Sequence, residues 1–189
     1  MSTEVFSDFI DELLKWNKSI NLVQESTTSS IQDRHILNSL LIKPHLDYAK
    51  DVIVDIGSGA GFPGLVLAID GAKNVHLVEP TGKKVVFLNH IKNIYKLPLH
   101  IHECRWQDLK LSNATVVTSR AFASLTNLLE AMSFVSRETK EASGIFLKGA
   151  KVKEEIVEAK QNWNFDMEVF ESPTHETGCV LKVSKVSRK

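Results

Sequence analysis

The chain of 189 residues, 43% of them hydrophobic and 24% charged, has the length and composition of one globular domain with a substantial core. No stretch is apolar for long enough to span a bilayer, the first residues show no signal-peptide pattern, and Cys104 and Cys179 alone make no disulfide framework. We therefore expect a cytoplasmic protein with no membrane partner. Because the formal net charge is zero, any nucleic-acid contact would have to come from a locally basic face.

Two helices are predicted in the first 48 residues. Residues 3–17 place apolar side chains at helical spacing, with acidic residues on the opposite side. A second helix is predicted from about Thr28 to His45, and Arg34 and His35 lie on or near its polar side. On their own, these two residues indicate no more than a solvated helix face.

From residue 51 onward, strand-like and helical segments alternate. Strands are expected at 52–56, 75–79, 99–104, 115–119, 144–148, 165–171 and 179–186. Such alternation predicts an α/β fold with a mostly parallel seven-stranded sheet and helices on both faces, and the last two strands are close enough to form an antiparallel hairpin at its edge. We expect one domain over 1–189, in which an N-terminal helical segment, 1–48, precedes an α/β core, 51–189.

The stretch Val52–Gly64 is the centre of the predicted site. Its first five residues are Val, Ile and Asp, typical of a buried parallel strand, and Gly57, Gly59 and Gly61 then follow at alternate positions. Glycine allows both a sharp turn and a close approach to a ligand, and Pro63 suits the first turn of a helix. The stretch therefore predicts a strand, a tight loop and a helix N-terminus that seat an adenosine-containing cofactor.

The acidic residues around this loop distinguish between cofactors. A dinucleotide fingerprint would be Gly-x-Gly-x-x-Gly, whereas here the spacing is Gly-x-Gly-x-Gly with Asp55 two residues before it. A carboxylate serves a pyrophosphate poorly, but it attracts the ammonium and sulfonium of S-adenosylmethionine (AdoMet). Glu79 ends the next hydrophobic run, where an acid can accept hydrogen bonds from both ribose hydroxyls. The residues favour AdoMet over a nicotinamide dinucleotide, and a glycine-rich turn of an unrelated sheet is the structural alternative.

Other side chains follow the predicted strands at the edge where ligands collect in open α/β sheets. Trp106 and Gln107 come after the third strand, where Trp106 can stack on an adenine; a surface loop with a partly buried Trp is the alternative. Arg120 ends the fourth strand and needs a carboxylate, a phosphate or a base as partner, or a structural salt bridge to Asp55 or Glu79.

Aromatic and basic residues share this edge. Phe62 and Phe122 can stack on an extruded base or belong to the core. Lys148 ends the fifth strand, and further lysines beside it make a basic rim of the kind that a neutral RNA-binding protein needs. His100, His102 and Cys104 alternate along one strand, where neighbouring side chains splay too widely to hold one ion, so no metal is expected.

Five segments carry a resemblance to a known family by their order and spacing: Asn21-Leu22, Arg34–Leu40, Val54–Gly64, Ser119–Leu125 and Leu147–Gly149. Over nearly its whole length the chain resembles the RsmG (GidB) family of bacterial 16S ribosomal RNA guanine-N7 methyltransferases. The resemblance implies the Rossmann-like class I fold of AdoMet-dependent methyltransferases. It also implies methyl transfer to a guanine N7 in 16S rRNA, with the small ribosomal subunit as partner.

The resemblance implies a role for each candidate residue. It places Arg120 in the cofactor and catalytic site, and it favours Arg34 and His35 as a pair that contacts RNA phosphate or lines the site. Lys148 is expected to contact the RNA from its place on the basic rim. The implied cofactor contacts are Asp55 to the ammonium region, Gly57, Gly59 and Phe62 to the methionine end, Glu79 to the ribose, and Trp106 with Gln107 to the adenine.

Two other functions are compatible with the same residues. One is an RNA-binding protein that senses AdoMet without turnover, since a fold does not guarantee catalysis. The other is a small-molecule methyltransferase of the same fold. We expect a monomer in either case.

Overall fold

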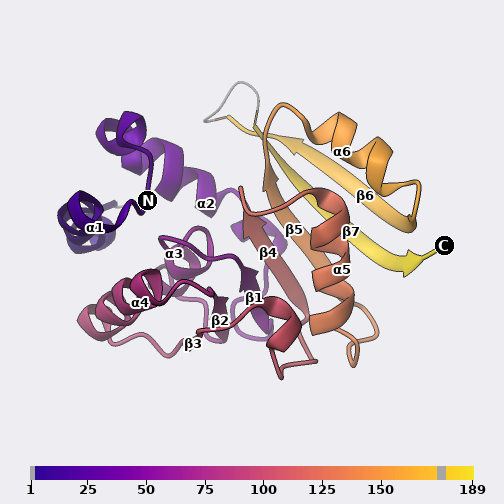
Figure 1. The fold of residues 1–189 in the computed structure, drawn as a ribbon, viewed down its shortest axis with the longest axis horizontal. Coiled ribbons are helices and arrows are strands. Elements are labelled where there is room, and N and C mark those ends of the chain that lie inside the picture. Colours follow the sequence, from indigo (N-terminus) through magenta and orange to yellow (C-terminus); the bar gives the residue numbers. More distant parts are fainter. Residues whose placement is uncertain (1–2, 174–177) are drawn as a thin grey trace.

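The computed structural model describes residues 3–173 and 178–189, with all side chains in those ranges except those of Thr3 and Ser29. A central sheet is covered by helices on both faces (Figure 1). The strands are β1 (Ile53–Ile56), β2 (Val75–Val78), β3 (His100–His102), β4 (Val116–Arg120), β5 (Ser143–Lys148), β6 (Trp163–Glu171) and β7 (Cys179–Arg188). The α-helices are α1 (Ser7–Ile20), α2 (Asn38–Leu40), α3 (Gly64–Ile69), α4 (Gly82–Tyr95), α5 (Leu125–Val135) and α6 (Val152–Ala159).

The sheet has the order β3-β2-β1-β4-β5-β7-β6. The pairs from β3 to β5 are parallel, and β7 runs antiparallel to both β5 and β6. This arrangement confirms the predicted mostly parallel sheet with a hairpin at its edge. It also brings the carboxyl ends of β1, β2, β4 and β5 to one edge, which is where the predicted site residues lie.

Alternate residues of each strand enter different cores, because successive side chains point to opposite faces of a sheet. Ile53 and Leu77 pack with side chains of α1, α3 and α4, whereas Val54 and Phe146 pack with α5 and α6. Phe9 and Leu13 of α1 are fully buried in the first of these cores. The predicted amphipathic N-terminal helix is thus an integral part of the packing.

The predicted continuous helix from Thr28 to His45 is wrong. The segment consists of short pieces: a 3-10 helix (Glu25–Ser30), a π-helical turn (Gln32–Leu37), α2 and a second 3-10 helix (Lys43–His45). Hydroxyl groups compete for its backbone carbonyls, since Thr27 Oγ1 donates to Gln24 O at 2.7 Å and Ser39 Oγ donates to His35 O at 2.6 Å. The irregular path still buries Ile36 and Ile42 completely.

Candidate active site

The glycine loop after β1 has the tight geometry that its residues predict. Gly57, Gly59 and Gly61 have φ values of 70°, 57° and 97°, which only glycine adopts without strain. The Gly61 N–H donates to Ser58 O at 2.7 Å, and the Ser58 hydroxyl donates to Asp55 O at 3.0 Å. A Cβ on Gly61 would lie 2.6 Å from Cβ of Leu65 in α3. The loop is therefore closed locally and packed directly against the following helix.

Asp55 lies beneath this loop. Its carboxylate is fully buried, accepts from the Thr118 hydroxyl at 3.0 Å and from the Gly64 N–H at 3.1 Å, and does not line the cavity above the loop. Burial raises its pKa to about 6, although these hydrogen bonds and the charge of Arg120 lower it. Asp55 thus ties the loop to β4 and to the start of α3.

A cavity of about 340 Å³ lies on the loop. It is lined by the glycine loop and Phe62, by Glu79 and Thr81 after β2, and by Arg120 at the end of β4 with Phe122 beyond it. We call it the donor cavity. Glu79, only 4% exposed, accepts from the Gly59 N–H and from the Thr81 N–H, each at 2.9 Å. Each of its carboxylate oxygens keeps a further lone pair for a hydroxyl donor.

A second cavity of about 210 Å³ adjoins the donor cavity, and both are lined by Gly57, Pro80 and Phe122. Its other walls are mostly apolar and include Ile56, Val78 and Trp106, with Gln107 at one side. Apolar walls with few polar groups suit a flat heterocycle. Phe122, 44% exposed, lies against Gly57 where the two cavities meet.

Arg120 lies over the ring of Phe62, with Cζ 4.5 Å from the ring centroid. Its Nη1 donates to the backbone carbonyl of Arg34 at 3.2 Å. Burial lowers the pKa of Arg120 to about 10, and the nearby Asp55 opposes this shift, so the guanidinium remains charged at neutral pH. Within the described residues Arg120 forms no ion pair, so the structural salt bridge considered from the sequence is not formed.

His35 stacks on the same Phe62 ring, with 5.0 Å between the ring centroids. Its Nε2 lies 3.0 Å from the Thr27 hydroxyl, and its Nδ1 is buried without a partner in the described part of the chain. Burial, reinforced by the charges of Arg120 and Arg34, lowers the pKa of His35 to about 4. The imidazole is therefore neutral at pH 7, whereas the exposed Arg34 presents a cation beside it.

Comparison with known proteins agrees with this site. The family model described as GidB, rRNA small subunit methyltransferase G, matches residues 2–179. The chain belongs to the GidB family. It is 39% identical to the ribosomal RNA small subunit methyltransferase G of Rhodospirillum rubrum over 99% of this chain and 92% of that protein. It is 37% identical to the protein of the same name from Rickettsia felis, over 98% and 93% of the two chains.

Solved structures with low sequence identity share the fold. A SAM-dependent methyltransferase from Aquifex aeolicus superposes with a TM-score of 0.64 at 12% identity, over 93% of this chain and 97% of that one. The Synechocystis magnesium protoporphyrin IX methyltransferase, solved with bound SAM, gives a TM-score of 0.59 at 11% identity, over 94% and 97%. The GidB family and the class I AdoMet-dependent methyltransferase fold are thus both confirmed.

The residues that line the donor cavity and the adjoining apolar cavity of this GidB chain fit AdoMet. The carboxylate of Glu79 at the donor cavity suits ribose hydroxyls, and the adjoining apolar cavity beside Trp106 suits an adenine. At Gly59 the loop backbone is open, because only the Gly57 carbonyl oxygen lies within 4 Å of the position that a Cβ would take, whereas at Gly57 the Phe122 ring fills that position.

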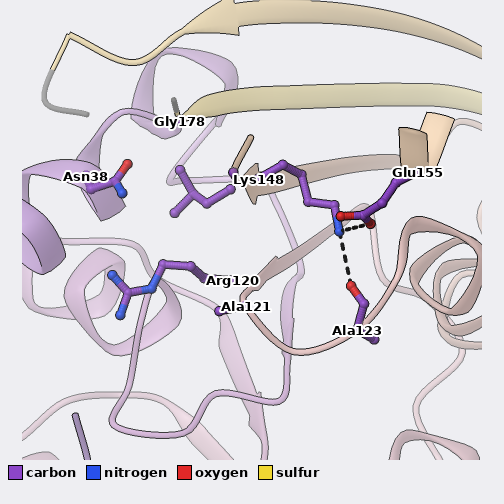
Figure 2. A pocket seen from close by; sticks show the side chains of 9 residues that line it. Asn38, Arg120, Ala121, Ala123, Lys148, Glu155 and Gly178 are labelled. Atoms are coloured by element: carbon purple, nitrogen blue, oxygen red, sulfur yellow. Dashed lines mark hydrogen bonds and ion pairs between the residues drawn. The ribbon is translucent and has the colours of Figure 1, made fainter. Parts of the chain in front are cut away.

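Lys148, predicted to contact RNA, already has two protein partners. Its Nζ lies 2.6 Å from Glu155 Oε2 and donates to Ala123 O at 3.0 Å, and its side chain is only 7% exposed (Figure 2). Glu155 Oε2 also accepts from the Leu125 N–H at 2.8 Å. No sequence pattern distinguishes Glu155 from its neighbour Glu154 in the charged helix α6, so only the tertiary structure shows that Glu155 is the partner of Lys148.

Proposed function

We propose that this GidB chain transfers a methyl group from AdoMet to N7 of a guanine in 16S ribosomal RNA of the small subunit. The observation that carries the proposal is the glycine loop with Glu79 at its cavity, beside a charged Arg120 that faces a further opening. Membership of the rRNA small subunit methyltransferase G family supports the choice of RNA as substrate.

Each candidate residue has a role in this proposal. Gly57, Gly59 and Phe62 line the methionine end, Glu79 accepts from the ribose, and Trp106 with Gln107 encloses the adenine. Asp55 acts through the loop that it holds, because its carboxylate is fully buried below it. When bound, AdoMet supplies an electrophilic methyl group on a sulfonium.

The site needs no general base for this chemistry. Guanine N7 has an in-plane lone pair and no proton, so the protein has only to align it with the methyl group. Alignment of this kind contributes roughly 7–11 kcal/mol in well-oriented systems. Methylation leaves a positive charge on the guanine, and a hydrogen bond from an Arg120 N–H to O6 would orient the base without blocking N7.

RNA contact is proposed at the edge next to Arg120. Arg34 is exposed and Lys84 lines the donor cavity, so both can meet phosphates. His35 stays neutral, and from the π-helical turn Gln32–Leu37 its ring packs on that of Phe62. Lys148 contributes to RNA binding only by exchanging one of its present partners for a phosphate.

The proposal includes a single domain that acts as a monomer in the cytoplasm. Residues of α1 share one core with α3 and α4, which supports the single domain. In the described part of the chain no helix is long and apolar enough to cross a membrane. Sedimentation of the purified chain measures its oligomeric state.

Transfer of labelled methyl from AdoMet to unmodified small subunits tests the function. We expect the label at one guanine, detected as 7-methylguanosine by strand cleavage at that nucleotide. Label at another atom would disprove the N7 assignment. Binding of AdoMet with no label in RNA would indicate the sensing protein, and methylation of a free nucleoside at a rate independent of salt would indicate a small-molecule enzyme.

A further inference from the structure

A third cavity, of about 250 Å³, adjoins the donor cavity across Arg120 and Ala121, which line both. We call it the base cavity. It lies at the carboxyl ends of β4 and β5 and is also lined by Asn38, Lys148 and Glu155 (Figure 2). Ala121, at the junction of the two cavities, has a φ of 52°, in the left-handed region that side chains other than glycine rarely adopt.

Among the described residues, some polar atoms that line the base cavity have hydrogen-bond partners in the protein and others have none. Glu155 Oε2 makes both contacts of that carboxylate, with Lys148 Nζ and the Leu125 N–H, so Oε1 has no partner among the described residues. The Asn38 side-chain amide likewise forms no hydrogen bond within the described ranges. Leu147, Ala121 and Ala123 supply apolar surface between them. A cavity of this composition suits a flat ligand with hydrogen-bonding edges.

We propose that the base cavity holds the target guanine, with Glu155 accepting hydrogen bonds from its N1–H and N2–H₂ groups. This inference rests on the proposed function and names the residue that selects the base. Guanine carries its two donor groups on one edge, whereas N7 lies on the opposite side of the purine. With the donor edge at Glu155, N7 points toward the wall formed by Arg120 and Ala121, which is the wall shared with the donor cavity.

The same orientation of the guanine gives Asn38, Arg120 and Lys148 a role in the base cavity. O6 lies beside N1 on the edge that faces away from the ribose, within reach of a donor from Asn38 or Arg120. Lys148 holds the Glu155 side chain against Ala123 and neutralises its charge, so the carboxylate can be partly buried without a substrate. An adenine presents an acceptor at N1 instead of a donor and would face the carboxylate with its lone pair.

The test compares small subunits reconstituted with guanosine or inosine at the methylated position, since inosine lacks only the 2-amino group. The wild-type chain should prefer guanosine in kcat/KM by about tenfold or more, the value of one hydrogen bond to a charged acceptor. Glu155→Gln should lower kcat/KM for guanosine and reduce this preference to about one. Its affinity for AdoMet should be unchanged.

Two further variants separate base recognition from a structural effect. Glu154→Gln changes the exposed neighbour in α6 and should retain the wild-type preference. Asn38→Ala should lower kcat/KM equally for both substrates, because O6 is present in guanosine and inosine alike. A Glu155→Gln chain that keeps the wild-type preference would overturn the inference, and so would a loss of preference in Asn38→Ala.

The outcomes also distinguish this inference from the proposed function. A wild-type chain that forms no 7-methylguanosine disproves the function itself. A wild-type chain that methylates N7 with equal kcat/KM for guanosine and inosine overturns only the role of Glu155. This second result is decisive even if Glu155→Gln does not fold.

Discussion

The glycine loop after β1 and the N-terminal segment Glu25–His45 meet at Phe62 and Arg120, but they are held in place differently. The loop is closed by hydrogen bonds between near neighbours and by left-handed glycines. The segment is held by contacts with distant parts of the chain, such as His35 on Phe62 and the Arg34 carbonyl under Arg120. Changes in the loop should therefore affect AdoMet binding, and changes in the segment should affect the RNA step.

Arg120 joins the two regions, and its removal should have the largest effect. Arg120→Ala should reduce the single-turnover rate about 100-fold, the loss expected when the guanine is no longer held in line with the methyl group. Thermal unfolding should change little. Arg137→Ala is the matched control, because Arg137 also lies over a phenylalanine ring, that of Phe134, but lines none of the three cavities of the site. An Arg120→Ala chain that unfolds would instead support a structural role.

Glu79 tests the loop side of the comparison. Glu79→Ala should weaken AdoMet binding about 10–100-fold, because hydrogen bonds to a charged acceptor contribute about 1.5–3 kcal/mol. Calorimetric titration with AdoMet measures the effect, and Glu103→Ala, which removes an exposed carboxylate after β3, should leave the affinity as it is. An unchanged affinity in Glu79→Ala would remove Glu79 from the donor site.

The local origin of the loop geometry is tested by two glycines. Gly61→Ala should cost about 1–3 kcal/mol of unfolding free energy from left-handed strain, with a further loss because its Cβ would meet Leu65. Gly71→Ala, at a φ of 115° with no atom within 4 Å of the new Cβ, carries the strain without the collision. Chemical denaturation should show the larger loss for Gly61→Ala, and only this variant should weaken AdoMet binding. Equal losses would show that contact with α3 is unimportant.

His35 gives the smallest effect and tests the segment side. Its pKa of about 4 in the folded protein lies below the unfolded value of 6.5, so the unfolded chain binds the proton more readily between these pH values. Stability should therefore fall as the pH falls from 6.5 toward 4. His35→Phe keeps a ring against Phe62 and should lose this part of the acid sensitivity. Denaturant titrations at both ends of the range measure the difference, and parallel curves for the two chains would contradict it.

The seven strands and the regular helices around them were predictable because their patterns are local. Alternating or continuous apolar runs mark the strands, and a serine is a typical N-cap residue: Ser124 caps α5, where its side chain accepts from the Asn127 N–H. The segment after α1 was not predictable to the same degree. Its apolar residues fit a helical period, but hydroxyl-to-carbonyl bonds and the burial of Ile36 and Ile42 impose a different path.

The residues of the candidate site also fall into those predictable from local sequence and those that depend on contacts between distant segments. The glycine spacing and Glu79 were recognisable because a cofactor loop needs these residue types at adjacent strand ends. Asp55 was predicted to meet the cofactor, whereas its burial beneath the loop depends on Thr118, 63 positions away along the chain. The pairing of Lys148 with Glu155 depends on how α6 packs against the end of β5, and so does the position of the Glu155 oxygen that has no partner in the described ranges.

By itself, the amino-acid order determined the family, the α/β alternation and the glycine loop, because each follows from residue types within a few positions of one another. Only the tertiary structure decided which carboxylates are buried, which cations are paired and which cavities share a wall at Arg120. Those properties arise from contacts between segments that are distant in the chain, and the energy of a charged group depends on the partners and the water that such contacts leave around it.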